Sequence, residues 1–416
     1  MKMSGIVLSQ SVRQNLLSLQ STSALLATTQ NDLATGNKVN SALDNPTDYF
    51  TAAALNNRAD SISNLLDGIS NGTQVLQAAN TGITSLQSLV ATAKSIANQV
   101  LQTTVGYSTK ASATIAAPTG TGPLSGIGTA ADLTVGGTNS LQGETLVFTP
   151  ATGSALTLTI SNVAGAGKVN SLDSINAALS TAGVGLTASL NTNGSLTFTS
   201  TNDNASQSLT AGTTAAANTV ALSGTATFAL VTPTGGTAGA PVADASSQTL
   251  RANFISQYNN IIQQITTTAQ DSSFNGVNLL NGDNLKLTFN ETGKSTLTIQ
   301  GTTFNATGLG LSNLTSGTDF LDNASANNVL TALTNANSTL QSEASALGSN
   351  LSIVQIRQDF SKNLINVLQT GASNLVIADP NEEAANSQAL ATRQSIAVSA
   401  LALANQSQAS VLQLLR

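Results

Sequence analysis

The chain has 416 residues, of which 40% are hydrophobic but only 3% aromatic and 8% charged, and its formal net charge is −6. It has no block of Lys and Arg that could follow a phosphate backbone, so we expect no nucleic acid partner. Cysteine and histidine are both absent. This composition excludes disulfides, thiol nucleophiles, imidazole bases and HExxH zinc sites. We therefore expect no enzyme, no cofactor, no metal site and no catalytic residue.

The N-terminal stretch Met1–Ser9 lacks the continuous apolar core of a secretory signal peptide. No window of the chain reaches about 18 uninterrupted apolar residues, the length of a membrane-spanning helix. We expect no membrane partner.

The first predicted element is an amphipathic helix from about residue 8 to residue 34. Val12, Leu19, Leu26 and Leu33 are seven residues apart, and Leu8, Leu16 and Leu25 widen the apolar stripe. Gly36 is suited to end this helix. Asn45 and Pro46 are suited to begin the next one, as N-cap and first helical residue.

The second predicted helix extends to about Gln102 and has the alternating spacing of a coiled-coil seam. Glycines at positions 68, 72 and 82 each cost about 1 kcal/mol in a helix interior, so we expect close helix-to-helix approach there. One series of the seam is Leu55, Ile62, Ile69, Leu76, Ile83, Val90 and Ala97, and the other is Leu65, Gly72, Ala79, Leu86, Ala93 and Val100.

The segment from Gly106 to Asp244 is rich in Thr, Gly, Ala and Ser and poor in charge. Short alternating runs predict strands at 145–148, 156–160, 186–190 and 196–199. Asn193-Gly194 predicts a hairpin turn between the last two strands, and residues 171–179 predict a short helix. The pattern indicates a separate β-β-α-β-β unit inserted into a helical protein.

Helical spacing returns at 248–269, and residues 285–289 and 296–299 predict a β-hairpin. A long helix from about residue 324 to residue 375 carries a second seam, which needs an apolar partner as the first one does. Asp379-Pro380-Asn381-Glu382 then predicts the start of a final helix, whose stripe continues through Gln394 and Gln408 to the last residue but one. The second seam comprises Leu330, Leu333, Asn337, Leu340, Ala344, Leu347, Leu351, Val354, Gln358, Ser361, Ile365, Leu368, Ala372 and Leu375.

These elements predict a mainly α fold: a hairpin-shaped, long-helix coiled-coil rod with a small β-hairpin, plus an inserted α+β domain. The seam residues predicted to form the rod core are Ile62, Ile69, Leu76, Ile83, Leu86, Val90, Leu340, Leu347, Leu351, Val354, Ile365 and Leu368. The two terminal helices keep apolar stripes at the chain ends, where fraying is usual. We therefore expect contacts with further copies of the chain through Leu8, Val12, Leu16, Leu19, Leu26, Leu33, Leu390, Ala397, Leu401, Ala404, Val411 and Leu415.

Four segments, in the same order along the chain, resemble bacterial flagellin. Residues 33–44 resemble the family's LSSGLRINSAKDD segment, and residues 77–99 are similar to its first long core helix. Residues 274–280, Phe-Asn-Gly-Val-Asn-Leu-Leu, are similar to FNGxxLL, and residues 410–416 to the closing NVLSLLR. The insert, especially residues 184–200, resembles the β-β-α-β-β inserts of flagellins and hook-associated proteins.

The resemblance implies a D0-like N-terminal helix (1–40), a D1-like rod in two parts (41–105 and 245–376), an outer D2-like domain (106–244) and a D0-like C-terminal helix (377–416). It also implies a homopolymeric helical filament for swimming motility, secreted by flagellar type III export. An export chaperone, a filament cap and hook-associated junction proteins are the implied partners. The hairpin at 285–299 is either the family's conformational switch element or a plain stabilising hairpin.

Two alternative functions remain open from the sequence. A hook–filament junction protein would share the terminal helices, although the match at 412–416 favours flagellin. A surface adhesin or glycan-binding homologue would use the insert. Tyr107 is the only Tyr of the insert, and the chain has no Trp, so few rings could stack on sugars.

We predict weak recognition by the innate flagellin receptor. The family's receptor-binding QRVRELAVQ sequence is poorly matched around residues 94–99, because Thr92 and Ser95 stand where Arg and Glu are expected. A reporter-cell assay should show weak signalling at doses that saturate with a strongly activating flagellin. Full-strength signalling would contradict the prediction.

Overall fold

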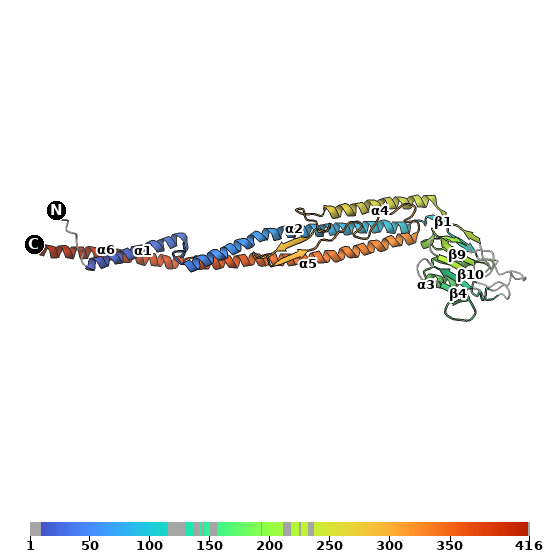
Figure 1. The fold of residues 1–416 in the computed structure, drawn as a ribbon, viewed down its shortest axis with the longest axis horizontal. Coiled ribbons are helices and arrows are strands. Elements are labelled where there is room, and N and C mark those ends of the chain that lie inside the picture. The colour runs from blue at the N-terminus through green and yellow to red at the C-terminus, as the bar shows by residue number, and fades with distance from the viewer. Residues whose placement is uncertain are drawn as a thin grey trace. The chain divides into compact units, whose positions relative to one another are not determined.

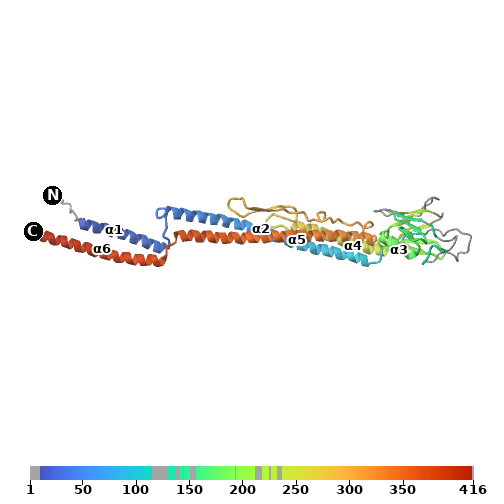
Figure 2. The ribbon, with the colours of Figure 1, turned by 90° about the horizontal axis from the view of Figure 1, so that it is seen from below.

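The computed structural model describes residues 10–114, 130–135, 141–143, 145–149, 156–192, 194–210, 218–223, 226–231 and 237–414. The chain forms two compact units. The first comprises the chain up to Gln74, Lys286–Ile299 and the chain from Asn350 onward, and the second comprises Val75–Leu285 and Gln300–Ser349. Figures 1 and 2 show the long helices and the sheet-containing insert. The predicted fold class, a helical rod with an inserted α+β domain, is confirmed.

Two pairs of helices form the first unit. Helix α1 (Gln10–Thr35) packs along α6 (Pro380–Leu414), as both views show. Helices α2 (Pro46–Gln102) and α5 (Asn323–Val376) each contribute one part to this unit. There Ala59 and Ile62 pack on Leu368, and the Gln358 amide donates a hydrogen bond of 2.8 Å to the Ser70 hydroxyl. Segments hundreds of residues apart thus cover one another's apolar seams.

A β-hairpin lies against both long helices of this unit. It consists of β13 (Leu285–Thr288) and β14 (Thr296–Ile299). Arg58 on α2 donates to the Glu291 carboxylate over 2.9 Å. The Arg357 guanidinium on α5 lies 5.6 Å from the centre of the Phe289 ring. The predicted hairpin therefore contacts α2 and α5 through charged groups, in addition to burying Leu287.

The helical part of the second unit contains the rest of α2 and α5, together with α4 (Ala245–Asp271). Asp244 is the N-cap of α4, and its carboxylate accepts a hydrogen bond of 2.9 Å from the Ser247 amide. Lys94 on α2 donates to the Thr334 hydroxyl on α5 over 3.3 Å. The buried core of this part includes Ile83, Leu86, Val90, Tyr258, Ile262, Ile265, Leu333, Ala336 and Leu340.

Arg251 is the largest buried polar side chain of this unit, with 1% of its surface exposed. Its guanidinium donates to the Phe320 carbonyl over 2.8 Å and to the Val100 and Thr104 carbonyls over 3.4 Å. The nearby Asp322 carboxylate accepts a 2.6 Å hydrogen bond from Ser206 of the insert. Burial lowers the pKa of Arg251, whereas the negative charge of Asp322 opposes this shift. One buried cation thus joins the end of α2, the start of α5 and α4 where the insert leaves the helices.

The insert contains a six-stranded and a four-stranded sheet, with strand orders β5-β4-β3-β10-β9-β8 and β11-β2-β7-β6. A short ladder, β1 with β12, connects its two ends to the helices. The elements are β1 (Tyr107–Thr109), β2 (Ser112–Thr114), β3 (Thr145–Thr149), β4 (Leu156–Ile160), β5 (Lys168–Val169), α3 (Leu172–Thr181), β6 (Leu186–Leu190), β7 (Leu196–Ser200), a 3-10 turn (Asn202–Asn204), β8 (Ser208–Thr210), β9 (Asn218–Ser223), β10 (Ala226–Val231), β11 (Thr237–Gly239) and β12 (Val242–Ala243).

The predicted strands and short helix of the insert are present in the expected β-β-α-β-β order, with the short strand β5 added before α3. The hairpins β3-β4 and β6-β7 belong to different sheets. They share one apolar core instead, in which Phe148 and Phe198 meet edge to face at 5.4 Å and α3 adds Ile175 and Leu179. The hydrophobic faces of the two hairpins therefore pack together, while β3 pairs with the later strand β10 and β7 pairs with the earlier strand β2. In the expected turn, Asn193 lies outside the described residues and Gly194 has a φ of 81°.

The glycines of α2 differ in what surrounds them. A Cβ on Gly82 would collide with the Ser272 hydroxyl and lie 2.6 Å from the Leu280 side chain, and one on Gly72 would collide with Leu287. A Cβ on Gly68 would have no atom within 4 Å other than those of its chain neighbours and of the backbone of its own helix. Gly72 and Gly82 therefore have close neighbours, but these are the hairpin and the segment after α4, so the expected helix-to-helix approach is wrong at both positions. The expectation is wrong within this chain at Gly68.

None of the helices in the described part of the chain is both long and apolar enough to cross a membrane.

Substitution by alanine should have opposite effects on the free energy of unfolding at Gly68, which has open space beside it, and at Gly82, which has close neighbours. Gly68→Ala should raise the free energy of unfolding by about 1 kcal/mol, the difference in helix propensity. Gly82→Ala should lower it by about 1 kcal/mol, because overpacking of about 1–3 kcal/mol outweighs the same gain. Urea unfolding followed by circular dichroism measures both changes. Equal stabilisation by both variants would contradict the packing described for Gly82.

Candidate assembly surfaces

The terminal helices α1 and α6 meet along one narrow seam. On α1, Val12 is 2% exposed and Leu26 is 9% exposed, and Leu19 is half-buried. On α6, Leu390, Ala397, Leu401 and Ala404 are half-buried, with the spacings of seven, four and three that the sequence predicts. Two helices can cover only one side of each other, so the pair leaves its outer sides uncovered.

Several of the residues predicted to contact further copies lie at the edge of this seam or beyond the described part. Leu16 and Leu33 are 37% and 41% exposed. Leu8 and Leu415 lie outside the described residues, and Val411 lies within α6. The structure thus brings Val12, Leu19 and Leu26 together with the α6 seam, whereas Leu16 and Leu33 stay partly exposed.

Further apolar side chains of this pair are exposed and were not singled out from heptad spacing. Leu17 is 66% exposed, and on α6 Ile396, Val398 and Leu403 are 63%, 51% and 71% exposed. A signal for them exists in the sequence. Residues 396–404 contain eight apolar residues and one serine, and a single neighbouring helix cannot cover a helix that is apolar on all sides.

The connector at residues 36–45 attaches the terminal pair to the longer helices of the first unit. Gly36 has a φ of 74° and ends α1 in the left-handed conformation. The Lys38 amide donates to the Val376 carbonyl over 2.7 Å, and the Ala378 amide donates to the Gly36 carbonyl over 2.9 Å. The end of α1 is therefore held to the end of α5 by backbone hydrogen bonds.

Two carboxylates in this connector have opposite pKa shifts. Asp32 is 9% exposed, and its carboxylate accepts a hydrogen bond of 3.0 Å from the side-chain amide of Asn40. Burial, with the charge of Asp44, raises the pKa of Asp32. Backbone amides of Ser41 and Asn40, which donate to Asp44 over 2.8 and 3.0 Å, lower the pKa of Asp44.

The predicted rod-core residues lie mostly in the interior. Ten of the twelve are buried, with exposures from 0% to 7%: Ile62, Ile69, Leu76, Ile83, Leu86, Val90, Leu340, Leu347, Val354 and Leu368. Leu351 and Ile365 are half-buried.

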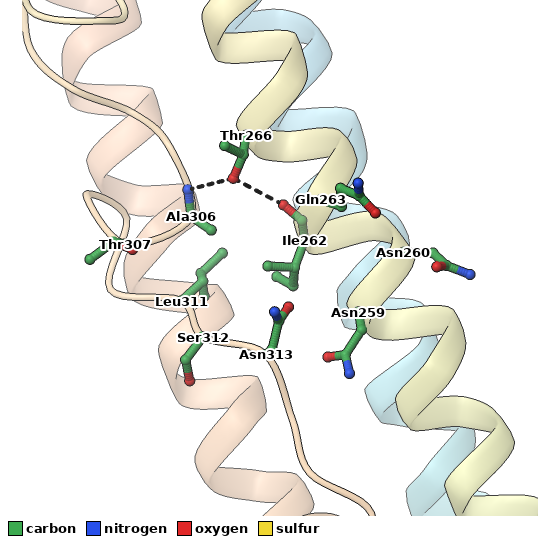
Figure 3. A pocket seen from close by; sticks show the side chains of 10 residues that line it. All are labelled: Asn259, Asn260, Ile262, Gln263, Thr266, Ala306, Thr307, Leu311, Ser312 and Asn313. Atoms are coloured by element: carbon green, nitrogen blue, oxygen red, sulfur yellow. Dashed lines mark hydrogen bonds between the residues drawn. The ribbon is translucent and has the colours of Figure 1, made fainter.

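A groove of about 570 Å³ lies between α4 and the segment 306–313 (Figure 3). The Thr266 hydroxyl accepts from the Ala306 amide over 3.4 Å and donates to the Ile262 carbonyl over 3.3 Å. The Asn259 side chain donates a hydrogen bond to the backbone carbonyl of Leu314 and accepts one from its backbone amide, each over 2.8 Å. These bonds hold the segment to the helix, and none of the ten lining residues is charged. The lining of the groove is therefore mostly polar but uncharged.

Within the described ranges, no group of three or more acidic side chains could hold a metal ion. The adjacent Glu382 and Glu383 lie in the first turn of α6, where negative charge complements the helix dipole. The Asp379 carboxylate accepts from the Asn381 amide over 2.8 Å, which confirms the predicted acidic N-cap.

These features define a class of mainly α-helical protein in which the two chain ends pair and an α+β domain interrupts a helical rod. The model of the bacterial flagellin N-terminal helical region matches residues 7–144, and that of the C-terminal helical region matches residues 330–415. Together they cover more than half of the chain. The chain belongs to the bacterial flagellin family.

Known relatives agree with this assignment. The chain is 34% identical over 176 residues to flagellins FljM and FljK of Caulobacter vibrioides. Each match covers 42% of this chain and 63% of the relative. It is also 39% identical over 77 residues to flagellin A of Rhizobium meliloti, and this match covers 18% of this chain and 20% of the relative. The chain thus spans less than two thirds of the length of these relatives.

The connector predicts a pH-dependent change in stability. Because the pKa of Asp32 is raised on folding, its contribution to stability is present at low pH and is lost as pH rises through the folded-state pKa. Asp32→Asn should therefore raise the thermal midpoint at pH 7 and leave it nearly unchanged at pH 3. Thermal unfolding at the two pH values measures this.

Asp44→Asn provides a control of opposite sign. The lowered pKa of Asp44 contributes stability above its unfolded pKa that is lost as pH falls, so this variant should be destabilised at pH 7. An Asp32→Asn variant that is less stable than wild type at pH 7 would contradict the assigned role of burial.

Proposed function

We propose that this chain is a structural subunit that polymerises into the bacterial flagellar filament and serves swimming motility. The observation that carries the proposal is the terminal helix pair, which exposes large apolar side chains on both members. Leu17 on α1 and Leu403 on α6 are 66% and 71% exposed. Membership of the flagellin family supports the same conclusion.

The energetics favour association through many weak contacts. Burial of apolar surface stabilises by about 25 cal/mol per Å², so covering one exposed leucine contributes on the order of 1–2 kcal/mol. A subunit that buries several such side chains against several neighbours gains enough to hold a polymer without covalent links. The absence of cysteine agrees with a non-covalent assembly.

We further propose that the chain has no enzymatic activity. It has neither histidine nor cysteine, and the groove beside α4 has no charged lining residue. Its work is mechanical: to form the filament and to transmit torque along it.

The proposed location is outside the cell, in the flagellar filament, after export through the flagellar type III apparatus. An export chaperone would cover the apolar α6 helix before assembly. A filament cap and hook-associated junction proteins would contact the subunit at the two ends of the polymer. These partners follow from family membership and from the need to cover α6 before neighbouring copies do.

Removal of either terminal helix should abolish polymerisation but leave the rest folded. Deletion of residues 1–35 or of residues 380–416 leaves α2, α4, α5 and the insert with their own cores. Each truncated protein should stay soluble and helical by circular dichroism, while sedimentation and electron microscopy show no filaments. The intact chain under the same conditions is the control. Long fibres from either truncation would contradict the proposal.

A further inference from the structure

The insert is joined to the helical part of the second unit by a narrow neck. Strands β1 and β12, which enter and leave the insert, pair over a short two-stranded ladder whose register shifts between Tyr107 and Thr109. The Asp244 amide donates to the Gly106 carbonyl over 3.0 Å, so the two crossings of the chain lie side by side. An isolated two-stranded ladder is only marginally stable. Two adjacent crossings define one axis, and the insert can turn about it unless a contact away from that axis holds it.

Such a contact joins Ser206 of the insert to Asp322 of the helical part. The Ser206 hydroxyl donates a hydrogen bond of 2.6 Å to one oxygen of the Asp322 carboxylate, and Asp322 is 4% exposed. A hydrogen bond to a charged acceptor is stronger than one between neutral groups, and shielding from water strengthens it further. This bond therefore gives the insert a third point of attachment, far along the chain from both strands of the neck.

The insert presents Ser206 on a turn that is fixed to its own sheet. The Asn204 amide donates to the Thr201 carbonyl over 3.2 Å, and the Gln207 amide donates to the Asn204 carbonyl over 3.1 Å. The Thr201 amide in turn donates to the Gly185 carbonyl over 2.9 Å, next to the hairpin of β6 and β7. A Cβ on Gly185 would collide with the Asn204 side chain. Ser206 is therefore part of the folded body of the insert.

Asp322 is fixed on the helical side, because it also begins α5. Its other carboxylate oxygen accepts a hydrogen bond of 3.0 Å from the Ser325 amide, and the Ser325 hydroxyl accepts one of 3.3 Å from the Asp322 amide. This reciprocal pair of bonds has the arrangement of a capping box. One carboxylate thus caps a helix with one oxygen and holds the insert with the other.

The backbone just before Asp322 is strained. Phe320 has a φ of 53°, which is a genuine outlier for a bulky residue. Its ring is 0% exposed and meets the Tyr258 ring edge to face, with the ring centres 6.2 Å apart. Its carbonyl accepts the 2.8 Å hydrogen bond from the buried Arg251. Strain of this kind persists only where the surrounding structure fixes it, and it is concentrated at sites that have a function.

We propose that the strained turn at Phe320 and the bond between Ser206 and Asp322 form a clasp that holds the insert in one orientation on the helical part. Arg251 and the buried Phe320 ring fix the backbone that carries Asp322, and the insert supplies the Ser206 hydroxyl. Without the clasp, the insert keeps its own core and stays attached through the neck, but it pivots there. This inference goes beyond the proposed filament function and is independent of it, because the orientation is a property of a single copy.

Double electron–electron resonance between two nitroxide labels measures this orientation, since the chain contains no cysteine of its own. Ala177→Cys on α3 and Asn335→Cys on α5 place one label on each part, at exposed residues. A second pair, Thr157→Cys on β4 with Asn335→Cys, detects rotations to which the first pair is insensitive. The full-length chain is measured as a monomer and diluted with unlabelled chain, so that distances between copies do not contribute. Each pair should give one narrow distance distribution, and a broad one would overturn the proposal.

Variants at Ser206 remove the clasp from the side of the insert. Ser206→Ala should roughly double the width of the distribution, because the bond to a charged acceptor is lost. Ser206→Val and Ser206→Thr are a matched pair, since both add similar bulk and only threonine keeps the hydroxyl. The valine variant should be broad and the threonine variant narrow, with helical content and thermal midpoint as in wild type. A wild-type width for Ser206→Ala would overturn the clasp.

Asp322→Ser removes the clasp from the helical side. Serine is also a good N-cap, so α5 stays capped, but its hydroxyl ends one bond short of the carboxylate oxygen that Ser206 contacts. The distribution should broaden as in Ser206→Ala. The double variant Ser206→Ala/Asp322→Ser should be no broader than either single variant, because both changes remove the same contact. Additive broadening would show two independent contacts and would overturn the assignment.

Ser189→Ala is the matched control within the insert. The Ser189 hydroxyl is exposed on β6 and donates to the Thr197 carbonyl over 3.2 Å, away from the helical part. This variant also loses one serine hydroxyl and one hydrogen bond, but it should keep the wild-type width. Broadening as large as that of Ser206→Ala would show that any lost hydroxyl loosens the insert, which would overturn the specific role of Ser206.

Discussion

The fold depends on long apolar seams that no single helix can bury. Ile62 on α2 is covered only because Leu368, about three hundred residues later, lies beside it. The same holds for the terminal pair, where Val12 and Leu26 of α1 are buried by a helix from the other chain end. With 3% aromatic residues, these seams interlock through Leu, Ile, Val and Ala. The two ends of the chain must therefore fold together.

The exposed fraction of the apolar seam residues differs along the chain. This difference separates the helices that form a complete core within one chain from those that we propose to assemble with other copies. The core seams of α2 and α5 reach 0–7% exposure at ten predicted positions. In the terminal pair, by contrast, the seam of α6 stays half-buried and large apolar residues remain outside. The helices that are least complete within one chain are those that we propose to be completed by neighbouring copies.

Charged groups are few, and several of them lie at junctions. Arg251 joins the ends of α2 and α5 to α4 beside the insert, and Arg58 and Arg357 hold the β-hairpin against its helices. Asp32 and Asp44 lie in the connector after α1. The chain has only 8% charged residues. The directional interactions of these side chains fix the register of segments that apolar seams alone would allow to shift along one another.

The sequence by itself determined the helices, their seams, the caps at Asn45 and Asp379, and most of the rod core, because heptad spacing and capping are local patterns. Only the tertiary structure decided that the two hairpins of the insert lie in different sheets, since strand pairing depends on partners far along the chain. It also decided which glycines have close neighbours: Gly72 and Gly82 do, and Gly68 does not. A seam shows which side of a helix is apolar, but what covers that side depends on which distant segment packs against it.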